Sequence, residues 1–272
     1  MKILLTGRTG QVGWELERAL PELGEVIATD RGVLDLVEKE AIQKALRREK
    51  PQIIVNAAAY TAVDKAESEK ELCMQINGVA PGVLAEEARR LGALLVHYST
   101  DYVFDGEKKS PYLEDDAPNP VNAYGAAKLE GERRIRESGC RHLILRTSWV
   151  YGPRGRNFFL TMRNARPPLR VVDDQRGVPT SSAFLAEHTL ALLRKDASGV
   201  VHLVPSGATT WYGFAREILG EKADLTPIRS SEYKTAARRP ASSVLANARA
   251  ASLLGRPLPP WQAVLAGVRK SA

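Results

Sequence analysis

The sequence predicts an α/β protein built on a doubly wound parallel sheet, and three observations carry that prediction. An apolar run at residues 2–6 leads directly into a glycine-spaced turn at residues 7–13. Residues 11–20 then show the periodicity of a helix. Apolar runs and amphipathic segments go on alternating through roughly the first 150 residues, which is typical of a parallel sheet with helices on its faces.

We divide the chain into a dinucleotide-binding Rossmann domain at residues 1–150 and a smaller C-terminal α+β substrate lobe at residues 151–272. The lobe is rich in proline and irregular, so we expect it to interleave with the first region rather than fold independently. It should cover the ligand end of the sheet and supply substrate specificity. The expected strands of the first region are residues 2–6, 26–29, 52–57, 93–98 and 142–147. The expected helices are residues 11–20, 35–50, 64–74, 79–91 and 124–137.

Three glycines, Gly7, Gly10 and Gly13, are spaced three residues apart between the first strand and the first helix. That context makes the pattern a dinucleotide-binding fingerprint. Gly7 permits the tight turn, Gly10 lets the backbone approach a diphosphate, and Gly13 lets helix and sheet pack closely. The diphosphate would then rest on the unpaired N–H groups of the helix N-terminus.

Charged residues near the second strand leave the choice of cofactor open. Asp30 stands twenty residues after Gly10, where a carboxylate can accept hydrogen bonds from the adenosine ribose of NAD. Arg31 follows it, and Arg8 lies inside the glycine turn. Either guanidinium can hold the 2′-phosphate of NADP. We therefore expect NADP(H) or NAD(H), with the preference unresolved.

Tyr124 and Lys128 are four residues apart, so on a helix they share one face. A fixed positive charge beside a phenol favours the phenolate and lowers its pKa, which predicts that Tyr124 donates a proton near neutral pH. Ser99 and Thr100 follow the strand at 93–98, at the edge where open α/β sheets bind ligands. An exposed helical tyrosine and lysine would give the same spacing, so the glycine turn is what gives the pair its meaning.

Two features outside the sheet strands also carry expectations. Asp35 and Glu38 have the spacing of a capping box and predict that a helix begins there. Asp35 is also a plausible neighbour of the cofactor, although the cap alone would explain it. Residues 105–123, rich in Gly, Pro, Asp and Asn, predict a long loop, and loops of that length are often functional.

Composition excludes several classes of protein. The net charge of +7 comes from 39 basic and 32 acidic residues, but the arginines are scattered and no nucleic-acid motif occurs. No apolar run approaches the roughly 20 residues that span a bilayer. Cys73 and Cys140 are the only cysteines and form no C-x-x-C pair, so we expect reduced thiols, no metal site and a cytoplasmic location.

Together these features resemble the extended short-chain dehydrogenase/reductases, and the match covers essentially the whole chain. More narrowly, the chain resembles the dTDP-4-dehydrorhamnose reductase family, whose members are oxidoreductases. The two most telling runs are His97-Tyr98-Ser99-Thr100-Asp101-Tyr102-Val103-Phe104 and Arg146-Thr147-Ser148-Trp149-Val150-Tyr151. Residues 6–16 and 56–67 carry the rest of the resemblance.

The resemblance implies a reaction and a role for each site residue. A nicotinamide would deliver hydride to C4 of dTDP-6-deoxy-L-lyxo-4-hexulose, and Tyr124 would protonate the C4 oxygen to give dTDP-L-rhamnose. Lys128 would tune Tyr124 and hold the nicotinamide ribose. Thr100 would hydrogen-bond the reacting oxygen, with Asp101 beside it and Trp149 lining the sugar site. Simpler roles are also open, Trp149 as a core aromatic and Asp101 as a loop hydrogen-bonder.

The same resemblance gives the two binding sets. The expected substrate contacts are Thr100, Asp101, Tyr124 and Trp149. Arg238 and Arg239 could in addition pair with a diphosphate, or form a surface turn. The expected cofactor contacts are Gly7, Gly10, Gln11, Val12, Gly13, Asp30, Arg31, Asp35, Leu36, Ala59, Tyr60, Thr61, Tyr98, Tyr124 and Lys128.

Relatives of the same fold leave two other functions open. A sugar-nucleotide 4,6-dehydratase carries Asp-Glu after its active-site Thr, whereas Tyr102 follows Asp101 here. Dehydratases and 4-epimerases also tend to carry Asn in place of Trp149. A third similar protein, the NADP-binding regulatory subunit of methionine adenosyltransferase, is no enzyme by itself. Some family members are metal-bridged dimers, which leaves a homodimer open, but we carry no metal over to Glu15.

Overall fold

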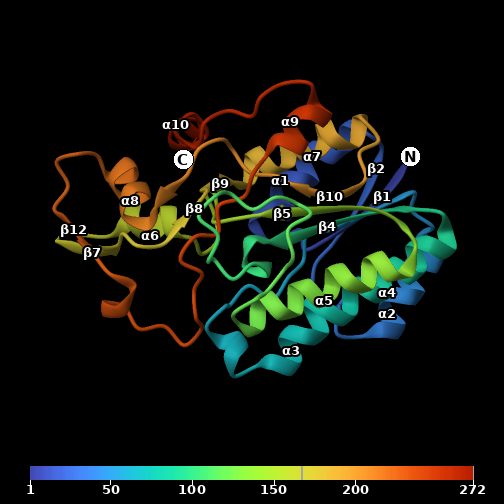
Figure 1. Cartoon of the computed structure of the whole chain (residues 1–272). Coiled ribbons are helices and arrows are strands. Elements are labelled where there is room, and N and C mark those ends of the chain that lie inside the picture. The colour runs from blue at the N-terminus through green and yellow to red at the C-terminus, as the bar shows by residue number, and fades with distance from the viewer. Residues whose placement is uncertain (167, 272) are drawn as a thin grey trace.

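The computed structural model describes residues 1–166 and 168–271 and confirms the doubly wound α/β fold. Six parallel strands form the central sheet in the order β10-β5-β4-β3-β1-β2. Helices cover both faces of this sheet, and a smaller lobe extends from one end of it (Figure 1). The strands of the sheet are β1 (Lys2–Thr6), β2 (Glu25–Thr29), β3 (Ile53–Asn56), β4 (Leu94–Thr100), β5 (Arg141–Thr147) and β10 (Gly199–His202).

Alternation along the strands divides the core into two layers. Ile3, Leu5 and Leu145 belong to the cluster that packs under α1 (Gln11–Ala19), α7 (Ser182–Arg194) and α9 (Ala248–Leu254). The intervening residues, such as Leu4 and Ile144, face the opposite helical layer. That layer contains α2 (Lys39–Glu49), α3 (Lys70–Met74), α4 (Ala80–Leu91) and α5 (Ala123–Ser138) (Figure 1). Strands buried on both faces in this way read as nearly continuous apolar runs.

The smaller lobe consists of short elements after residue 150. Its chain is not separate from the first region, because β10 pairs with β5 at the edge of the main sheet and α7 packs against α1. The boundary at residue 150 stays a prediction. The remaining elements are β6 (Val150–Tyr151), α6 (Phe158–Asn164), β7 (Leu169–Val172), β8 (Arg176–Gly177), β9 (Thr180–Ser181), β11 (Thr209–Thr210), α8 (Trp211–Leu219), β12 (Leu225–Ile228) and α10 (Trp261–Ser271).

Two local predictions are wrong. The capping box at Asp35 and Glu38 does not form, because the Asp35 carboxylate accepts the N–H of Val37 (3.0 Å) and α2 begins only at Lys39. Such a local Asx hydrogen bond competes with helix initiation. The helix predicted at residues 64–74 is instead a 3₁₀ turn, Lys65–Glu67, followed by α3.

A π-helical turn, Gln75–Val79, joins α3 to α4, so the predicted break before residue 79 is also absent. Its close contact with α5 explains the distortion. A Cβ at Gly131 would lie 2.3 Å from the carbonyl oxygen of Asn77, so a glycine there lets the two helical segments touch. The buried Asn77 side chain holds the backbone of Tyr60 through two hydrogen bonds of 2.9 Å.

Other predicted boundaries fall within a residue or two of the observed ones. The strand expected at 93–98 continues to Thr100 as β4, and α5 begins at Ala123 because the Asn122 side chain accepts the N–H of Gly125 (2.8 Å). Residues 104–122 form no helix or strand beyond a bridge at Tyr112, as expected for the long loop. No helix in the described ranges has the length and hydropathy needed to cross a membrane.

A buried ion pair ties α5 to the sheet. Arg146 on β5 donates to both carboxylate oxygens of Glu132 on α5, at 2.9 and 2.7 Å, and Ser99 on β4 donates to the same carboxylate at 2.5 Å. The two charged side chains are 2% and 0% exposed. Since an uncompensated buried charge is costly, this pair fixes the helix against two strands.

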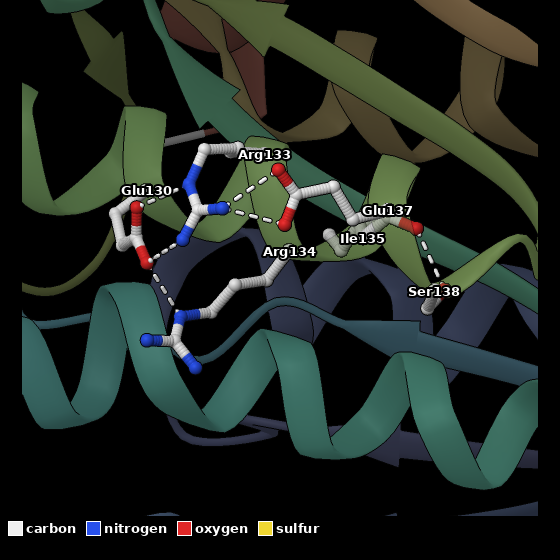
Figure 2. A network of polar contacts seen from close by, with 6 residues as sticks. All are labelled: Glu130, Arg133, Arg134, Ile135, Glu137 and Ser138. Atoms are coloured by element: carbon white, nitrogen blue, oxygen red, sulfur yellow. Dashed lines mark hydrogen bonds and ion pairs between the residues drawn. The ribbon is translucent and has the colours of Figure 1, made fainter.

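Replacing Arg146 with Met should lower the free energy of unfolding by about 3–5 kcal/mol, because it leaves the Glu132 carboxylate buried without its partner. Guanidinium denaturation would measure the loss. The matched control is Arg133→Met on α5, the helix that carries Glu132. Arg133 bridges Glu130 and Glu137 at the surface (Figure 2), where ion pairs contribute little. Equal denaturation midpoints for the two variants would contradict the expectation.

Candidate functional site

A cavity of about 860 Å³ opens at the carboxyl ends of the sheet strands. Residues directly after β1, β2, β3, β4 and β5 contribute to it, together with the start of α1 and side chains from the smaller lobe. Its lining includes Gly7, Gly10, Gln11, Val12, Asp30, Arg31, Asp35, Leu36, Ala59, Tyr60, Thr61, Tyr98, Thr100, Asp101, Tyr124, Lys128 and Trp149, with Arg156, Trp211 and Arg239 from later in the chain.

The glycine turn forms one end of the cavity. Gly7 has φ +75°, a conformation that favours glycine, and its carbonyl oxygen would lie 2.0 Å from a Cβ at Gly13. Among the predicted cofactor contacts, Gly13 is the one that does not line the described cavity. Its role is to let α1 pack closely against the turn at Gly7. Gly10 caps α1 and has no side chain to cover the first N–H groups of the helix. These features fit a diphosphate.

The groups that could select the cofactor lie at the same end. Asp30 Oδ1 accepts the N–H groups of Gly32 (3.0 Å) and Val33 (3.3 Å), and Arg31 Nε donates to Asp35 Oδ2 (3.1 Å). Both Asp30 and Arg31 line the cavity. Arg8 pairs with Glu17 (2.8 Å) on the exposed side of the turn. A carboxylate and a guanidinium thus stand side by side at the position expected for an adenosine ribose.

Thr100, Asp101 and Tyr124 meet near the middle of the cavity. Thr100 Oγ1 donates to Asp101 Oδ1 (3.0 Å), and the other carboxylate oxygen accepts from Ser243. Burial raises the pKa of the Asp101 carboxyl to about 7, although the hydrogen bonds from Ser243 and Thr100 oppose the rise. The Thr100 hydroxyl also lies near the Tyr124 hydroxyl and favours its ionised form.

The pKa of Tyr124 is raised in this structure, whereas the helix spacing predicted that Lys128 would lower it. Burial of the hydroxyl raises the pKa of Tyr124 well above its usual value. The Lys128 ammonium points instead to the carbonyl oxygen of Tyr98 and, at 3.2 Å, to His97 Nε2. Lys128 is 2% exposed, and burial lowers its own pKa to about 8, opposed by Glu132. A spacing of four residues indicates that two side chains share one face of a helix. It carries no information about how much water those side chains lose when the protein folds.

Trp149, near the end of the first region, and Trp211 of the lobe form an aromatic wall. The rings of Trp149 and Trp211 are stacked, with centroids 3.5 Å apart and planes at 7°, and both line the cavity. Trp149 has φ +44°, unusual for a residue with a large side chain. Its ring lies directly over Gly177, where a Cβ would approach Trp149 Cε2 to 2.4 Å. A strained residue held by its surroundings is common at functional sites.

Sequence reasoning missed Trp211 and Arg156 and left Arg239 undecided. Arg239 donates to Asp64 Oδ2 (2.8 Å) and to the Tyr102 hydroxyl (3.2 Å), so it links the lobe to the loop after β3. Arg156 is exposed at the cavity. Neither Trp211 nor Arg156 belongs to a recognisable motif, and only tertiary structure brings them to the sheet. Within the described residues, no group of three or more His, Cys, Asp or Glu is placed to hold a metal ion.

The fold and the cavity together define a dinucleotide-binding α/β protein of the short-chain dehydrogenase/reductase type. Residues 1–271 match the family described as RmlD substrate binding domain, and the chain belongs to that family. It is 45% identical to dTDP-4-dehydrorhamnose reductase of Burkholderia thailandensis over 96% of both chains. It is 44% identical to the enzyme of the same name from Escherichia coli K12, over 96% of this chain and 95% of the relative.

Solved structures agree with this assignment. The crystal structure of dTDP-4-dehydrorhamnose reductase from Bacillus anthracis str. Ames, in complex with NADP, has a TM-score of 0.95 and 34% identity, covering 100% of this chain and 99% of that one. The NAD complex of Thermus thermophilus UDP-glucose 4-epimerase has a TM-score of 0.78 at 22% identity, over 94% of both chains. At that identity the likeness shows a shared fold and nothing about activity.

Replacing Gly177 with Ala should displace the Trp149 ring, because the added methyl would lie only 2.4 Å from Cε2. We expect loss of the near-ultraviolet circular dichroism of the stacked tryptophans and a destabilisation of about 1–3 kcal/mol from overpacking. Gly267→Ala is the control, since a methyl there meets no atom of the described residues within 4 Å. An unchanged tryptophan spectrum in Gly177→Ala would contradict the expectation.

Proposed function

We propose that this protein catalyses the NAD(P)H-dependent reduction of the C4 keto group of dTDP-6-deoxy-L-lyxo-4-hexulose (dTDP-4-dehydro-L-rhamnose) to dTDP-L-rhamnose. The observation that carries the proposal is the meeting of Thr100, Tyr124 and Lys128 at the cavity beside the glycine turn. This arrangement occurs in a chain 45% identical to a protein named for that reaction.

The proposed catalytic roles follow from the chemistry of the three side chains. When bound, the reduced nicotinamide supplies a hydride for C4. Tyr124 supplies the proton to the C4 oxygen, and its raised pKa keeps the hydroxyl protonated before the reaction. Thr100, whose hydroxyl lies near that of Tyr124, orients the sugar oxygen. A protonated Lys128, buried below them, stabilises the phenolate that remains after proton transfer.

The proposed cofactor site is the end of the cavity with the glycine turn. Gly7 and Gly10 let the backbone approach the diphosphate, and Gln11 and Val12 present the helix N-terminus. Asp30, Arg31, Asp35, Leu36, Ala59, Tyr60, Thr61 and Tyr98 form the rest. The adjacent carboxylate of Asp30 and guanidinium of Arg31 support use of either NADP(H) or NAD(H).

The proposed sugar-nucleotide site is the end of the cavity covered by the lobe. Trp149 and Trp211 offer flat apolar surface for a sugar or a base. Asp101 is buried beside Thr100, and Arg239 and Arg156 offer positive charge for a diphosphate. A homodimer and a cytoplasmic location are further proposals, which rest on resemblance to the family and on composition.

Tyr124→Phe should abolish reduction, with kcat lowered by about 10²–10⁴-fold, because loss of a general acid typically costs that much. Dinucleotide affinity, measured by fluorescence titration, should change little, because the ring and Lys128 remain. Tyr233→Phe serves as the control, since Tyr233 is 62% exposed and outside the cavity lining. Reduction by Tyr124→Phe at nearly the wild-type rate would remove Tyr124 as the proton donor.

The purified protein should consume one NADH or NADPH per molecule of keto-sugar, as followed by absorbance at the nicotinamide band. A 4-epimerase or a 4,6-dehydratase of the same fold would turn over its substrate with no net consumption of reduced cofactor. A regulatory protein would bind the dinucleotide without turnover. The stoichiometry therefore separates the proposed reductase from both other classes.

A further inference from the structure

A row of buried polar side chains crosses three strands beneath the cavity and ends at Lys128. Thr6 Oγ1 donates to Asn56 Oδ1 (2.7 Å), and Asn56 Nδ2 lies 3.0 Å from His97 Nδ1. The other ring nitrogen of His97, Nε2, lies 3.2 Å from Lys128 Nζ. Thr6, Asn56 and His97 are each 1% exposed.

Strand register builds this row. Thr6 on β1 is the register partner of Asn56 on β3, and Asn56 is the partner of His97 on β4. Register partners on neighbouring parallel strands point to the same face of the sheet. The residues two positions earlier on these three strands point to that face as well, and they pack against α2, α4 and α5. Lys128, on the helix α5 that covers this face, contacts His97 at the end of the row. Three buried polar groups joined in one row call for a role beyond packing.

The His97 ring is uncharged, because burial and the nearby Lys128 hold its pKa well below the usual value. A neutral imidazole has one N–H donor and one acceptor nitrogen. The direction of its hydrogen bond with Lys128 therefore fixes the direction of its hydrogen bond with Asn56. The amide of Asn56 transmits the same constraint to Thr6.

Two complete arrangements satisfy the row. If Lys128 is an ammonium, it donates to His97 Nε2, and His97 Nδ1–H donates to the Asn56 carbonyl oxygen. The Asn56 amide must then be turned over about its Cβ–Cγ bond, exchanging the places of Oδ1 and Nδ2, so that its N–H donates to Thr6 Oγ1. If Lys128 is an amine, every donor is reversed: Thr6 donates to Asn56, Asn56 to Nδ1, and Nε2–H to the lone pair of Lys128. Uptake of one proton from solvent by Lys128 converts the second arrangement into the first.

We propose that His97 is a positioning residue that couples the charge of Lys128 to the direction of the hydrogen-bond row Thr6–Asn56–His97. The other titratable groups that interact with Lys128 are Glu132 on α5 and Cys73 on α3. Glu132 is held by Arg146, and burial raises the pKa values of Cys73 and Tyr124. His97 can both donate to Lys128 and accept from it while remaining neutral.

This inference rests on the proposed function only for its effect on turnover, and its direct test needs no substrate. The protein is labelled with [¹³Cε]lysine, and the Lys128 resonance is assigned by its absence from Lys128→Met. Titration by NMR then gives the pKa of Lys128. His97→Leu removes the acceptor, and a lost hydrogen bond to a charged group should lower the pKa of Lys128 by about 1 to 2 pH units.

Two further variants keep a polar group beside Lys128 or His97. His97→Gln offers an amide oxygen to the ammonium and should return the titration midpoint to within about half a pH unit of the wild-type value. An ionised aspartate in Asn56→Asp can only accept from His97, which favours the ammonium arrangement, so it should raise the midpoint. His188→Leu, which removes another buried histidine, on α7, should leave the Lys128 midpoint unchanged.

A Lys128 midpoint in His97→Leu within about 0.3 pH unit of wild type would overturn the inference, and so would an equal shift in His188→Leu. If His97→Leu does not fold, an unchanged midpoint in Asn56→Asp overturns it. The alkaline limb of the kcat–pH profile is measured on the same variants. A shifted NMR titration with an unshifted limb supports the role of His97 but contradicts the role proposed for Lys128 in reduction. Absence of any turnover in the wild type contradicts the proposed function alone.

Discussion

Burial of the Lys128 ammonium is the constraint on which the arrangement of the site depends. A lysine that is 2% exposed keeps its charge only if neighbouring groups replace the lost water. Here a backbone carbonyl at the end of β4, the imidazole of His97 and the carboxylate of Glu132 surround it. Glu132 in turn needs Arg146 on β5. One buried charge therefore accounts for the buried polar side chains of His97 on β4, Glu132 on α5 and Arg146 on β5.

The glycine contacts impose a second, purely steric, constraint. Gly13 touches the backbone of Gly7, Gly131 touches that of Asn77, and Gly177 lies against the ring of Trp149. Each contact brings two elements closer than any side chain would allow. The helix N-terminus, the π-helical turn and the aromatic wall owe their positions to these approaches. The cavity is thus bounded by close backbone packing at one end and by stacked rings at the other.

Much of this structure could be predicted from the sequence, because its signals are local. The glycine turn, the strand ending at Thr100 and the Tyr124–Lys128 spacing each lie within a few residues of chain, and each reaches the cavity or packs behind it. Trp211 and the hydrogen-bond row of His97 could not be found in this way, since both depend on which distant segments become neighbours. The predicted direction of the Tyr124 pKa shift was wrong for a related reason. Helical spacing specifies neighbours on one face, whereas desolvation depends on everything packed around them.

The edge strand β10 has a consequence for how the chain is made. The sheet needs residues 199–202 alongside β5. In addition, α7 must cover the part of the sheet face that lies beside α1. During synthesis, the carboxyl-half segments emerge well after β5 and α5 have left the ribosome, so the nascent amino-terminal half waits with an unpaired edge and an uncovered apolar face. Unpaired edges and bare apolar surface promote association with other chains. Completion of this protein is therefore a late event, and the interval before it is when chaperone binding would matter most.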